Sequence, residues 1–279
     1  MILRRSFLAS AAAFAAWPVI ARADTSRVTF SNSLEQGSLV FGKAPGAARV
    51  SVDGTNALVS PDGEFVFGFA YDQTKSATVA LLYNDGTRET RVIAPIARQY
   101  ELQAINGVPE KFVSPSPDQL VRIKREGDTI VQARTRDTAQ TFFDGGFDWP
   151  IAGIITSLFG SRRVLNGVPK SPHLGVDIAA PEGTPIHAPA DAIVSLVGPD
   201  FYYDGNLTLL DHGHGVSTCY VHQQKILVKE GDRVRRGDVI GAIGQTGRAT
   251  GPNLHWGLNL FQLKLDPSRS TPTPAPPKA

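Results

Sequence analysis

Histidine is the residue type in this sequence whose placement most clearly indicates chemistry. All six histidines fall between positions 173 and 255, and the first 172 residues contain none. Neutral imidazole side chains bind zinc, and they accept and release protons near neutral pH. This concentration of histidines indicates a metal site, an acid–base site, or both, in the second half of the chain.

The segment 173–181, HLGVDIAAP, alternates apolar residues with polar or small ones. If it forms a strand, its apolar residues face a core, and His173 and Asp177 share the opposite face. Gly175 lies between them and leaves room for a metal ion or a substrate. Histidine and aspartate are both zinc ligands, although this spacing alone favours an ordinary half-buried strand with a polar edge.

Two further segments repeat this arrangement. In STCYVH, Tyr220 and His222 fall on one face of an expected strand. In NLHW, Asn253 and His255 share a face, with apolar residues opposite. One strand of this kind is common, but three strands that each present ligand-type side chains predict a single convergent site.

The other three histidines give weaker signals. His212 and His214 lie in the glycine-rich segment DHGHG, which is typical of a turn. We expect His214 to be solvated or to donate a local hydrogen bond, and His212 to support the site from outside the ligand group. His187 is expected on the surface of a sheet.

Strand and turn patterns are predicted on both sides of one helix. From residue 27 to 93, alternating segments are separated by turn signals, and EFVFGFA places three phenylalanines at period two. This spacing predicts a small β-sandwich of immunoglobulin type. Residues 116–140 are predicted to form a helix, with Ser116 as its cap and Pro117 at the first helical position. Strand patterns resume at Phe147.

The N-terminus has the pattern of an export signal. Arg4 and Arg5 precede an apolar run that ends at Ile20, and Ala21-Arg22-Ala23 matches a small-x-small cleavage site. The run is too short to cross a bilayer, which needs ~20 apolar residues. The two arginines favour a twin-arginine signal, with an ordinary secretory signal as the alternative. Both predict an exported chain that begins at Asp24.

Charge and cysteine content narrow the class of protein. Loss of residues 1–23 removes three arginines and no acid, so the formal net charge of +2 becomes −1. A near-neutral chain does not require a basic face, so we expect no nucleic-acid partner. The single Cys219 cannot form an internal disulfide. An exported protein without disulfides fits a bacterial periplasm.

The segments HLGVDIAAPEGTPIHAPADAIV, LLDHGHGVSTCYVH and VKEGDRVRRGDVIGAIGQTGRATGPNLHW follow one another in the second half of the chain. Together they resemble the LytM/lysostaphin-type zinc endopeptidases, which cut peptide cross-links in bacterial cell walls. The resemblance covers roughly residues 147–266. It implies a mainly β chain whose C-terminal antiparallel β-sheet peptidase domain is of the duplicated hybrid motif or barrel-sandwich type.

By position in these motifs, the resemblance implies that His173, Asp177 and His255 are ligands of one zinc ion per chain. His222, in the Tyr-x-His motif, is implied to be a catalytic residue near the metal. Two imidazoles and a carboxylate leave zinc one open position for water. Zinc lowers the pKa of that water towards ~7, so that zinc-bound water can act as the nucleophile.

Asn253 departs from the family pattern, because the first histidine of the H-x-H pair falls on it. An amide cannot carry a proton at neutral pH, but it can donate a hydrogen bond to a developing oxyanion. If the missing histidine stabilises charge, asparagine retains much of its function. If it transfers a proton, the chain loses much of the ~10²–10⁴-fold rate that such a group supplies.

Loop residues are candidates for substrate contact. Tyr202 and Tyr203 lie in the segment GPDFYYDG, and Asn166 lies in a segment that is expected to form another wall of the groove. Arg162 or Arg163 could meet a peptide carboxylate, although a solvated charge is the more ordinary interpretation of each.

The expected organisation is a signal peptide over 1–23, a β-sandwich over 24–108, a linker with a helix over 109–146, a zinc peptidase domain over 147–268, and a Pro-rich disordered tail over 269–279. The implied function is zinc-dependent cleavage of peptidoglycan stem-peptide cross-links by a periplasmic monomer. The alternative, which Asn253 favours, is a slow or non-catalytic envelope regulator or wall-binding protein that activates other cell-wall hydrolases. A third possibility, a biotinyl or lipoyl carrier, lacks the exposed lysine on a tight turn that attachment needs.

Overall fold

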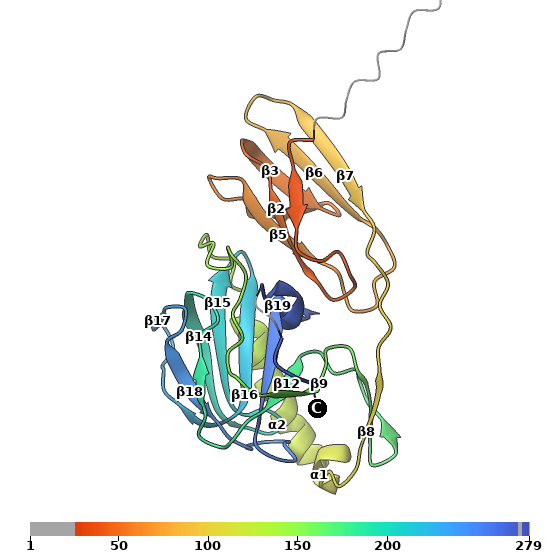
Figure 1. Ribbon diagram of the computed structural model, residues 1–279, viewed down its shortest axis with the longest axis vertical. Coiled ribbons are helices and arrows are strands. Elements are labelled where there is room, and N and C mark those ends of the chain that lie inside the picture. The colour runs from red at the N-terminus through yellow and green to blue at the C-terminus, as the bar shows by residue number, and fades with distance from the viewer. Residues whose placement is uncertain (1–25, 273–274, 279) are drawn as a thin grey trace, which may run out of the picture.

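The computed structural model describes residues 26–272 and 275–278. The predicted signal peptide, residues 1–23, lies outside the described residues. The described chain is mainly β, as predicted, and its sheets form an upper and a lower part in Figure 1. Within these described ranges, none of the helices has the length and apolar character to cross a membrane.

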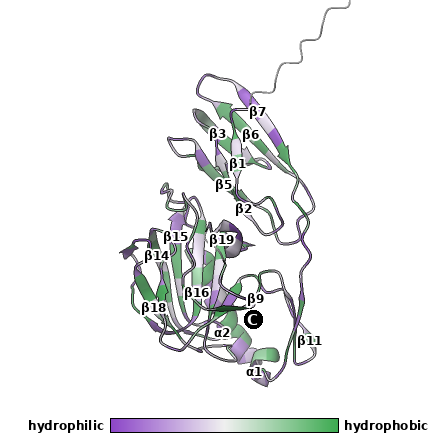
Figure 2. Ribbon diagram, in the orientation of Figure 1, coloured by the Kyte–Doolittle hydropathy of each residue, from purple (hydrophilic) through white to green (hydrophobic). Residues whose placement is uncertain are grey.

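The upper part consists of two antiparallel sheets that enclose a shared core. One sheet has the order β1 (Thr29–Ser31), β2 (Leu39–Lys43), β5 (Glu64–Gly68), and the other has the order β4 (Thr55–Ala57), β3 (Ala47–Val52), β6 (Ala77–Tyr83), β7 (Arg88–Ile93). Phe65, Phe67 and Phe69 are all buried in this core, as their period-two spacing predicts. Strand β7 alternates exposed with partly buried residues before the buried Ile93, and part of it has the hydrophilic colour in Figure 2. The immunoglobulin type of this sandwich stays a prediction.

The segment between the two parts contains β8 (Leu102–Ile105), α1 (Glu110–Val113) and α2 (Pro117–Ala133). Ser116 caps α2 as predicted: its Oγ accepts a bond from Gln119 N, and the Gln119 side chain accepts one from Ser116 N. This reciprocal pair satisfies two free backbone donors of the first turn. The helix is shorter than the predicted 116–140, because Arg134 forms its C-cap.

The lower part is built on a ten-stranded sheet. Seven strands follow one another in the order β17 (Arg233–Val234), β14 (Ala192–Phe201), β15 (Gly205–Gly213), β16 (Val216–Ile226), β19 (Asn253–Leu260), β12 (Val176–Ala179), β9 (Ile154–Ser157). Three further strands pair beside this path: β13 (Pro185–His187), β18 (Val239–Ile243) and β20 (Leu263–Leu265). A small separate sheet joins β8 to β10 (Arg162–Leu165) and β11 (Val168–Pro169). The 3-10 helix Pro267–Ser270 follows.

The upper and lower parts share contacts and core residues. Leu39 and Val66 of the sandwich belong to the same buried cluster as Trp256 and Leu265 of the lower part. Asp266 forms an ion pair with Arg98, with 2.9 Å between Asp266 Oδ2 and Arg98 Nη1. The backbone N of Asp266 also donates a hydrogen bond to Gly37 O at 2.7 Å. The β-sandwich therefore packs against the lower part through these contacts, in addition to the covalent linker that joins them.

The described residues of the C-terminal tail also make ordered contacts. Pro277 O accepts a hydrogen bond from Ile155 N at 2.8 Å, and the Lys278 ammonium lies 2.7 Å from a Glu101 carboxylate oxygen. The disorder predicted for residues 269–279 stays a prediction. β9 is an edge strand with unpaired backbone donors, and an extended proline-rich chain offers carbonyls to them.

Both His212 and His214 are buried in the lower part, so the predicted role of His212 is wrong and His214 is not solvated. His212 is fully buried, packs against Phe147, and bonds to Asp191 O and Thr218 Oγ1, so it does not contact the expected ligand group. His214 packs against Phe143, and of its two expected environments it has the hydrogen-bonded one, through the backbone of Ala139. Strand β15 continues through the DHG segment that composition marks as a turn.

The burial of His212 predicts a pH-dependent loss of stability. Burial lowers the pKa of His212 from 6.5 to about 4, so the unfolded chain binds a proton between these values that the folded chain does not. Stability is therefore fully present above pH 6.5 and falls as the pH drops towards 4. His212 should account for about 2–3 kcal/mol of the loss between pH 7 and pH 4.5.

Urea denaturation of the wild type and of His212→Gln at both pH values measures this contribution. Glutamine does not titrate, so the variant should be less stable at pH 7 and lose about 2–3 kcal/mol less on acidification. Equal losses in the two proteins would contradict the prediction.

Candidate metal centre

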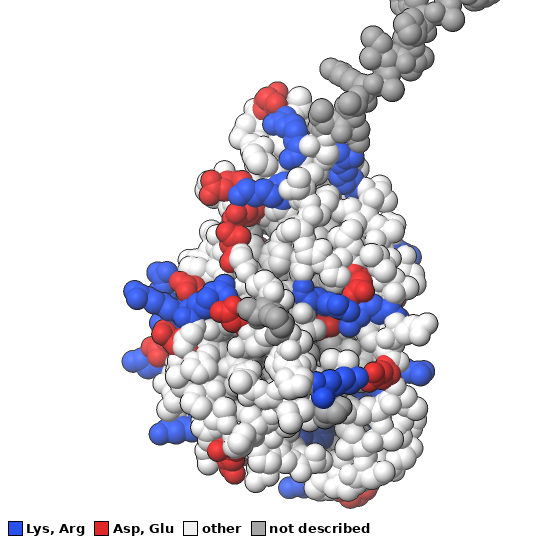
Figure 3. All heavy atoms as spheres, viewed as in Figure 1, with Lys and Arg blue, Asp and Glu red and all other residues white. Residues whose placement is uncertain are grey.

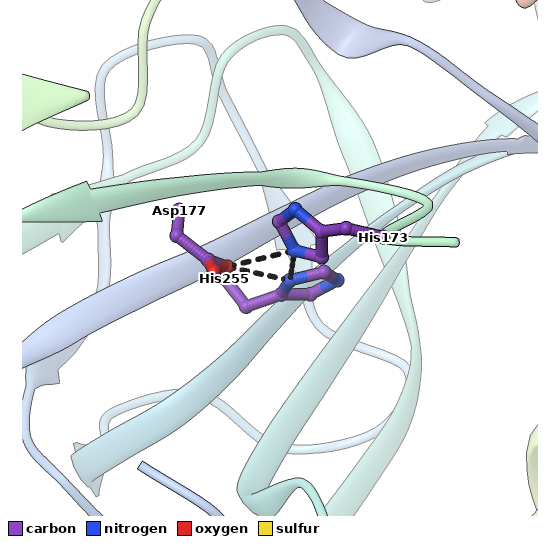
Figure 4. Close-up of side chains that lie close together, drawn as sticks. All are labelled: His173, Asp177 and His255. Atoms are coloured by element: carbon purple, nitrogen blue, oxygen red, sulfur yellow. Dashed lines mark hydrogen bonds and ion pairs between the residues drawn. The ribbon is translucent and has the colours of Figure 1, made fainter. Parts of the chain in front are cut away.

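Three side chains of the lower part converge on one point. His173 Nε2 lies 2.9 Å from His255 Nδ1 and 3.0 Å from Asp177 Oδ1, and His255 Nδ1 lies 2.8 Å from the same carboxylate oxygen. Figure 4 shows the two imidazoles and the carboxylate pointing toward one another. Two ring nitrogens and one oxygen within this distance form a group that could hold a metal ion.

The pairing of β12 with β19 places two of these side chains. Asp177 lies directly opposite His255, and Val176 lies opposite Trp256. Side chains alternate across a strand, so Val176 and Trp256 enter the core while Asp177 and His255 leave it on the other face. Val176 and Trp256 are fully buried, as the alternation predicts.

His173 lies just before β12 and is held by its other ring nitrogen. Its Nδ1 is 2.8 Å from Ser157 Oγ, and that hydroxyl donates to Gln103 Oε1 at 2.7 Å. Since the Ser157 hydrogen is used for Gln103, the Ser157 oxygen accepts from His173 Nδ1–H. This tautomer leaves the Nε2 lone pair facing Asp177 and His255, as a metal ligand requires.

Arg163 holds the second oxygen of the Asp177 carboxylate. Its Nη2 lies 2.6 Å from Asp177 Oδ2, and both side chains are largely buried. Burial alone would raise the pKa of Asp177, but His173 and His255 hold it well below its usual value. The solvated charge that composition favours for Arg163 is therefore wrong, and the carboxylate stays ionised with Oδ1 turned to the histidines.

The donor set fits zinc. Imidazole nitrogen and carboxylate oxygen are zinc ligands, and three protein ligands with one open position characterise catalytic zinc sites. Burial lowers the pKa of His255, so its imidazole is neutral at pH 7 and offers a lone pair. Each ligand side chain is also oriented by its position opposite a partner strand or by a hydrogen bond to a neighbour.

Gly175 makes room for this arrangement. A Cβ on Gly175 would lie 2.4 Å from His255 Cε1 and 2.6 Å from His255 Nε2. The sequence predicted space for a metal or a substrate at this position, and the structure shows that the imidazole of His255 occupies it.

His222 reaches the same groove through a break in strand alternation. Between Asn206 and Thr208 of β15, β16 has one residue more than its partner, and His222 has a φ of +67°. Such a bulge redirects a side chain. Tyr220 instead points into the core beside Trp256, so the prediction that Tyr220 and His222 share a face is wrong.

The local contacts of His222 define its protonation. Its Nδ1 lies 2.8 Å from Thr246 O, so Nδ1 carries the hydrogen and Nε2 is the free acceptor. Burial lowers the pKa of His222 to about 4. At neutral pH the side chain is therefore an uncharged base that lines the groove with the ligand group.

Asn253 begins β19 and lines the same groove. Its Nδ2 donates to Gly251 O at 2.9 Å, and its buried Oδ1 has no hydrogen-bond partner among the described residues. The amide is thus held in one orientation by its own loop, at the edge of the site.

The segment that precedes α2 forms the opposite wall of the groove. The apolar lining consists of Ile105, Val108, Pro109 and Phe112. Two hydrogen bonds join Asn166 to the backbone of Val108, so the side chain of Asn166 supports this wall. Sequence patterns did not indicate that the linker contributes to the site.

The two tyrosines have different environments. Tyr202 is buried, and its hydroxyl donates a hydrogen bond to Lys111 O at 2.6 Å. Tyr202 therefore stabilises the wall of the groove that the segment before α2 forms. Tyr203 lines the groove itself. Of the three expected substrate contacts, only Tyr203 faces the space where a substrate would bind.

Comparisons with known proteins agree with this geometry. Residues 171–267 match peptidase family M23. The chain is 45% identical over 106 residues to the peptidoglycan DD-endopeptidase ShyA of Vibrio cholerae, and 43% identical over 103 residues to the DD-carboxypeptidase/endopeptidase Mpg of Neisseria meningitidis. Each match covers 37% of this chain and 24% of the relative, so the similarity spans about a quarter of those proteins.

The fold comparison extends over more of the chain. A crystal structure from Pseudomonas aeruginosa that is assigned to peptidase M23 matches with a TM-score of 0.66 and 28% identity. The match covers 85% of this chain and 94% of that structure. The similarity therefore includes regions outside residues 171–267.

Gly175→Ala should weaken metal binding without unfolding the chain. The added methyl group would overlap the His255 imidazole, and displacement of one ligand typically lowers affinity at least 10-fold. Zinc affinity is measured by competition with a chromogenic chelator. Gly251→Ala is the matched control, because a Cβ there meets no atom within 4 Å. Equal affinities in the two variants would contradict the prediction.

Proposed function

Residues 171–267 form a peptidase family M23 domain, and from this premise we propose that the chain is a zinc-dependent endopeptidase that cuts peptide cross-links of bacterial peptidoglycan. The observation that carries the proposal is the convergence of His173 Nε2, Asp177 Oδ1 and His255 Nδ1 beside the neutral base His222. The names of the two bacterial relatives support the choice of substrate.

The proposed ligands are His173, Asp177 and His255, with one zinc per chain. When bound there, zinc would polarise the scissile carbonyl and lower the pKa of a water molecule towards ~7. Neighbouring side chains orient these ligands: Ser157 sets the tautomer of His173, and Arg163 binds Asp177 Oδ2, so that Oδ1 faces the two histidines.

His222 is the proposed proton carrier. Its free Nε2 accepts the proton of the attacking water, and the resulting imidazolium donates that proton to the leaving amine. With a pKa of about 4, His222 is a weak base at neutral pH. It is therefore unprotonated in nearly all molecules before reaction and releases its proton readily.

Asn253 is the proposed hydrogen-bond donor to the carbonyl oxygen. Only one of its two amide hydrogens is used for Gly251 O, so the other is available to a developing negative charge. The alternative function, a slow or non-catalytic regulator of other wall hydrolases, is favoured by the same residue, because an amide cannot replace an imidazole in proton transfer.

The proposed location is the periplasm, on the basis of the predicted export signal. On the face that Figure 3 shows, most of the surface is uncharged, and acidic and basic side chains lie next to one another in small groups. This mixed face agrees with a near-neutral exported protein that recognises its substrate within a groove.

Incubation of residues 24–279 with cross-linked peptidoglycan tests the proposed function. We expect new amino groups in the presence of zinc, and about one zinc per chain by elemental analysis. His173→Ala should lose both, because two ligands do not hold zinc tightly. His187→Ala is the control, because His187 bonds to Gly237 O away from the groove. Absence of new amino groups from pH 6 to pH 9 would contradict the proposal.

Asn253→His should raise turnover if the site needs a second proton carrier. The gain would lie within the ~10²–10⁴-fold that general acid–base catalysis supplies, and kcat on a soluble cross-linked peptide measures it. An unchanged or lower kcat, with the zinc content of the wild type, would show that the site uses the amide as an oxyanion donor.

A further inference from the structure

One positively charged side chain of the groove, that of Arg248, has no partner of opposite charge among the described residues. The side chain of Arg248 lines the groove and is half-buried, yet it forms no hydrogen bond or ion pair with any described residue. Burial lowers the pKa of Arg248, which reflects the cost of keeping its charge away from water. A buried charge without a partner is destabilising unless a ligand supplies the opposite charge.

The guanidinium is nevertheless held in place. It lies over the ring of Tyr203, 4.4 Å from the centroid, and Arg248 N donates to Tyr203 O at 2.8 Å. Tyr203 in turn contacts the rings of Tyr202 and Phe112. A stacked guanidinium keeps its N–H edge free for two parallel hydrogen bonds, which match the geometry of a carboxylate.

The other cations of the groove are not equivalent. Arg163 is paired with Asp177, and the Lys170 ammonium donates to Val113 O at 2.8 Å. Lys264 is exposed to solvent. Among the described residues that line the groove, Arg248 thus combines burial, fixed position and an unused charge.

The position of Arg248 indicates which part of a substrate it meets. Thr246 O holds His222 Nδ1, and Arg248 follows two residues later in the same loop. His222 is the proposed donor of a proton to the leaving amine, so the leaving amine lies on this side of the site. A carboxylate attached to the carbon that bears this amine would lie next to the Arg248 guanidinium.

On the basis of the proposed function, we propose that Arg248 selects amides whose nitrogen is attached to a carbon with a free carboxylate. A cross-link through the amine of a diaminopimelate residue has this carboxylate, whereas a cross-link through an unsubstituted lysine ε-amine lacks it. In the reaction, water oxygen bonds to the carbonyl carbon, the C–N bond breaks, and the amine takes up a proton. Arg248 binds the carboxylate throughout.

Two synthetic substrates test this selection. Both contain N-acyl-D-alanine linked to diaminopimelate; one has the free carboxylate beside the scissile nitrogen, and the other has a carboxamide there. We expect wild-type kcat/KM to be about 10- to 100-fold higher for the acid, the range of a charged hydrogen bond. Arg248→Gln should remove this preference, because glutamine has no charge to pair with the carboxylate.

Arg248→Lys and Lys264→Gln complete the comparison. The lysine variant should keep part of the preference, because it retains charge without the fork of donors. Lys264→Gln removes an exposed cation of the same groove and should keep the full preference. Equal rates on the two substrates in the wild type, or an unchanged preference in Arg248→Gln, would overturn the inference.

A binding experiment separates this inference from the proposed function. In the presence of a chelator, titration calorimetry with the same two compounds should give an about 10-fold or greater difference in Kd that Arg248→Gln abolishes. If the wild type hydrolyses neither compound but shows this difference, the proposed function fails and the inference stands. Hydrolysis without any difference in rate or Kd overturns the inference alone.

Discussion

The register between β12 and β19 is the constraint on which the site depends. It places Asp177 opposite His255 on one face and Val176 opposite Trp256 on the other. A slip of one residue would exchange the faces: the carboxylate and the imidazole would enter the core, and the indole would enter the groove. Because full burial of a large apolar side chain is worth ~1.5–3 kcal/mol, the hydrophobic side of the pair fixes the register of the polar side. The core therefore positions the chemistry without contacting it.

Departures from regular strand geometry occur where the groove needs them. Gly175 lacks the Cβ that would overlap the His255 ring, and His222 adopts a left-handed φ at a bulge that turns it from the core to the groove. A left-handed residue other than glycine is strained by ~1 kcal/mol or more. Two hydrogen bonds of His222 stabilise this conformation: its backbone N donates to Asp204 O, and its ring Nδ1 bonds to Thr246 O.

Strand alternation was enough to predict the parts of the site that lie on regular strands. The period-two pattern around Asp177 and His255 gives their shared face, and the fold class follows from short strands and turn signals. The same rule wrongly predicted that His222 shares a face with Tyr220. The β-bulge that turns His222 away from that face has no clear signal in the sequence. The pairing of Arg163 with Asp177 and of Ser157 with Gln103 joins segments far apart in the chain. His212 was misplaced because β15 extends through a segment whose glycines resemble a turn.

The groove also shows why the matching peptidase segment is not the whole site. Residues 171–267 carry His173, Asp177, His222 and His255, but the apolar wall opposite them belongs to 105–112 and lies outside that match. Asn166, Lys170 and Tyr202 bind the backbone of this wall through hydrogen bonds to residues 108, 113 and 111. Backbone contacts of this kind hold the wall in position whatever side chains it carries. The linker can therefore change the shape of the groove by substitution at its exposed side chains, while the strands keep the ligand geometry constant.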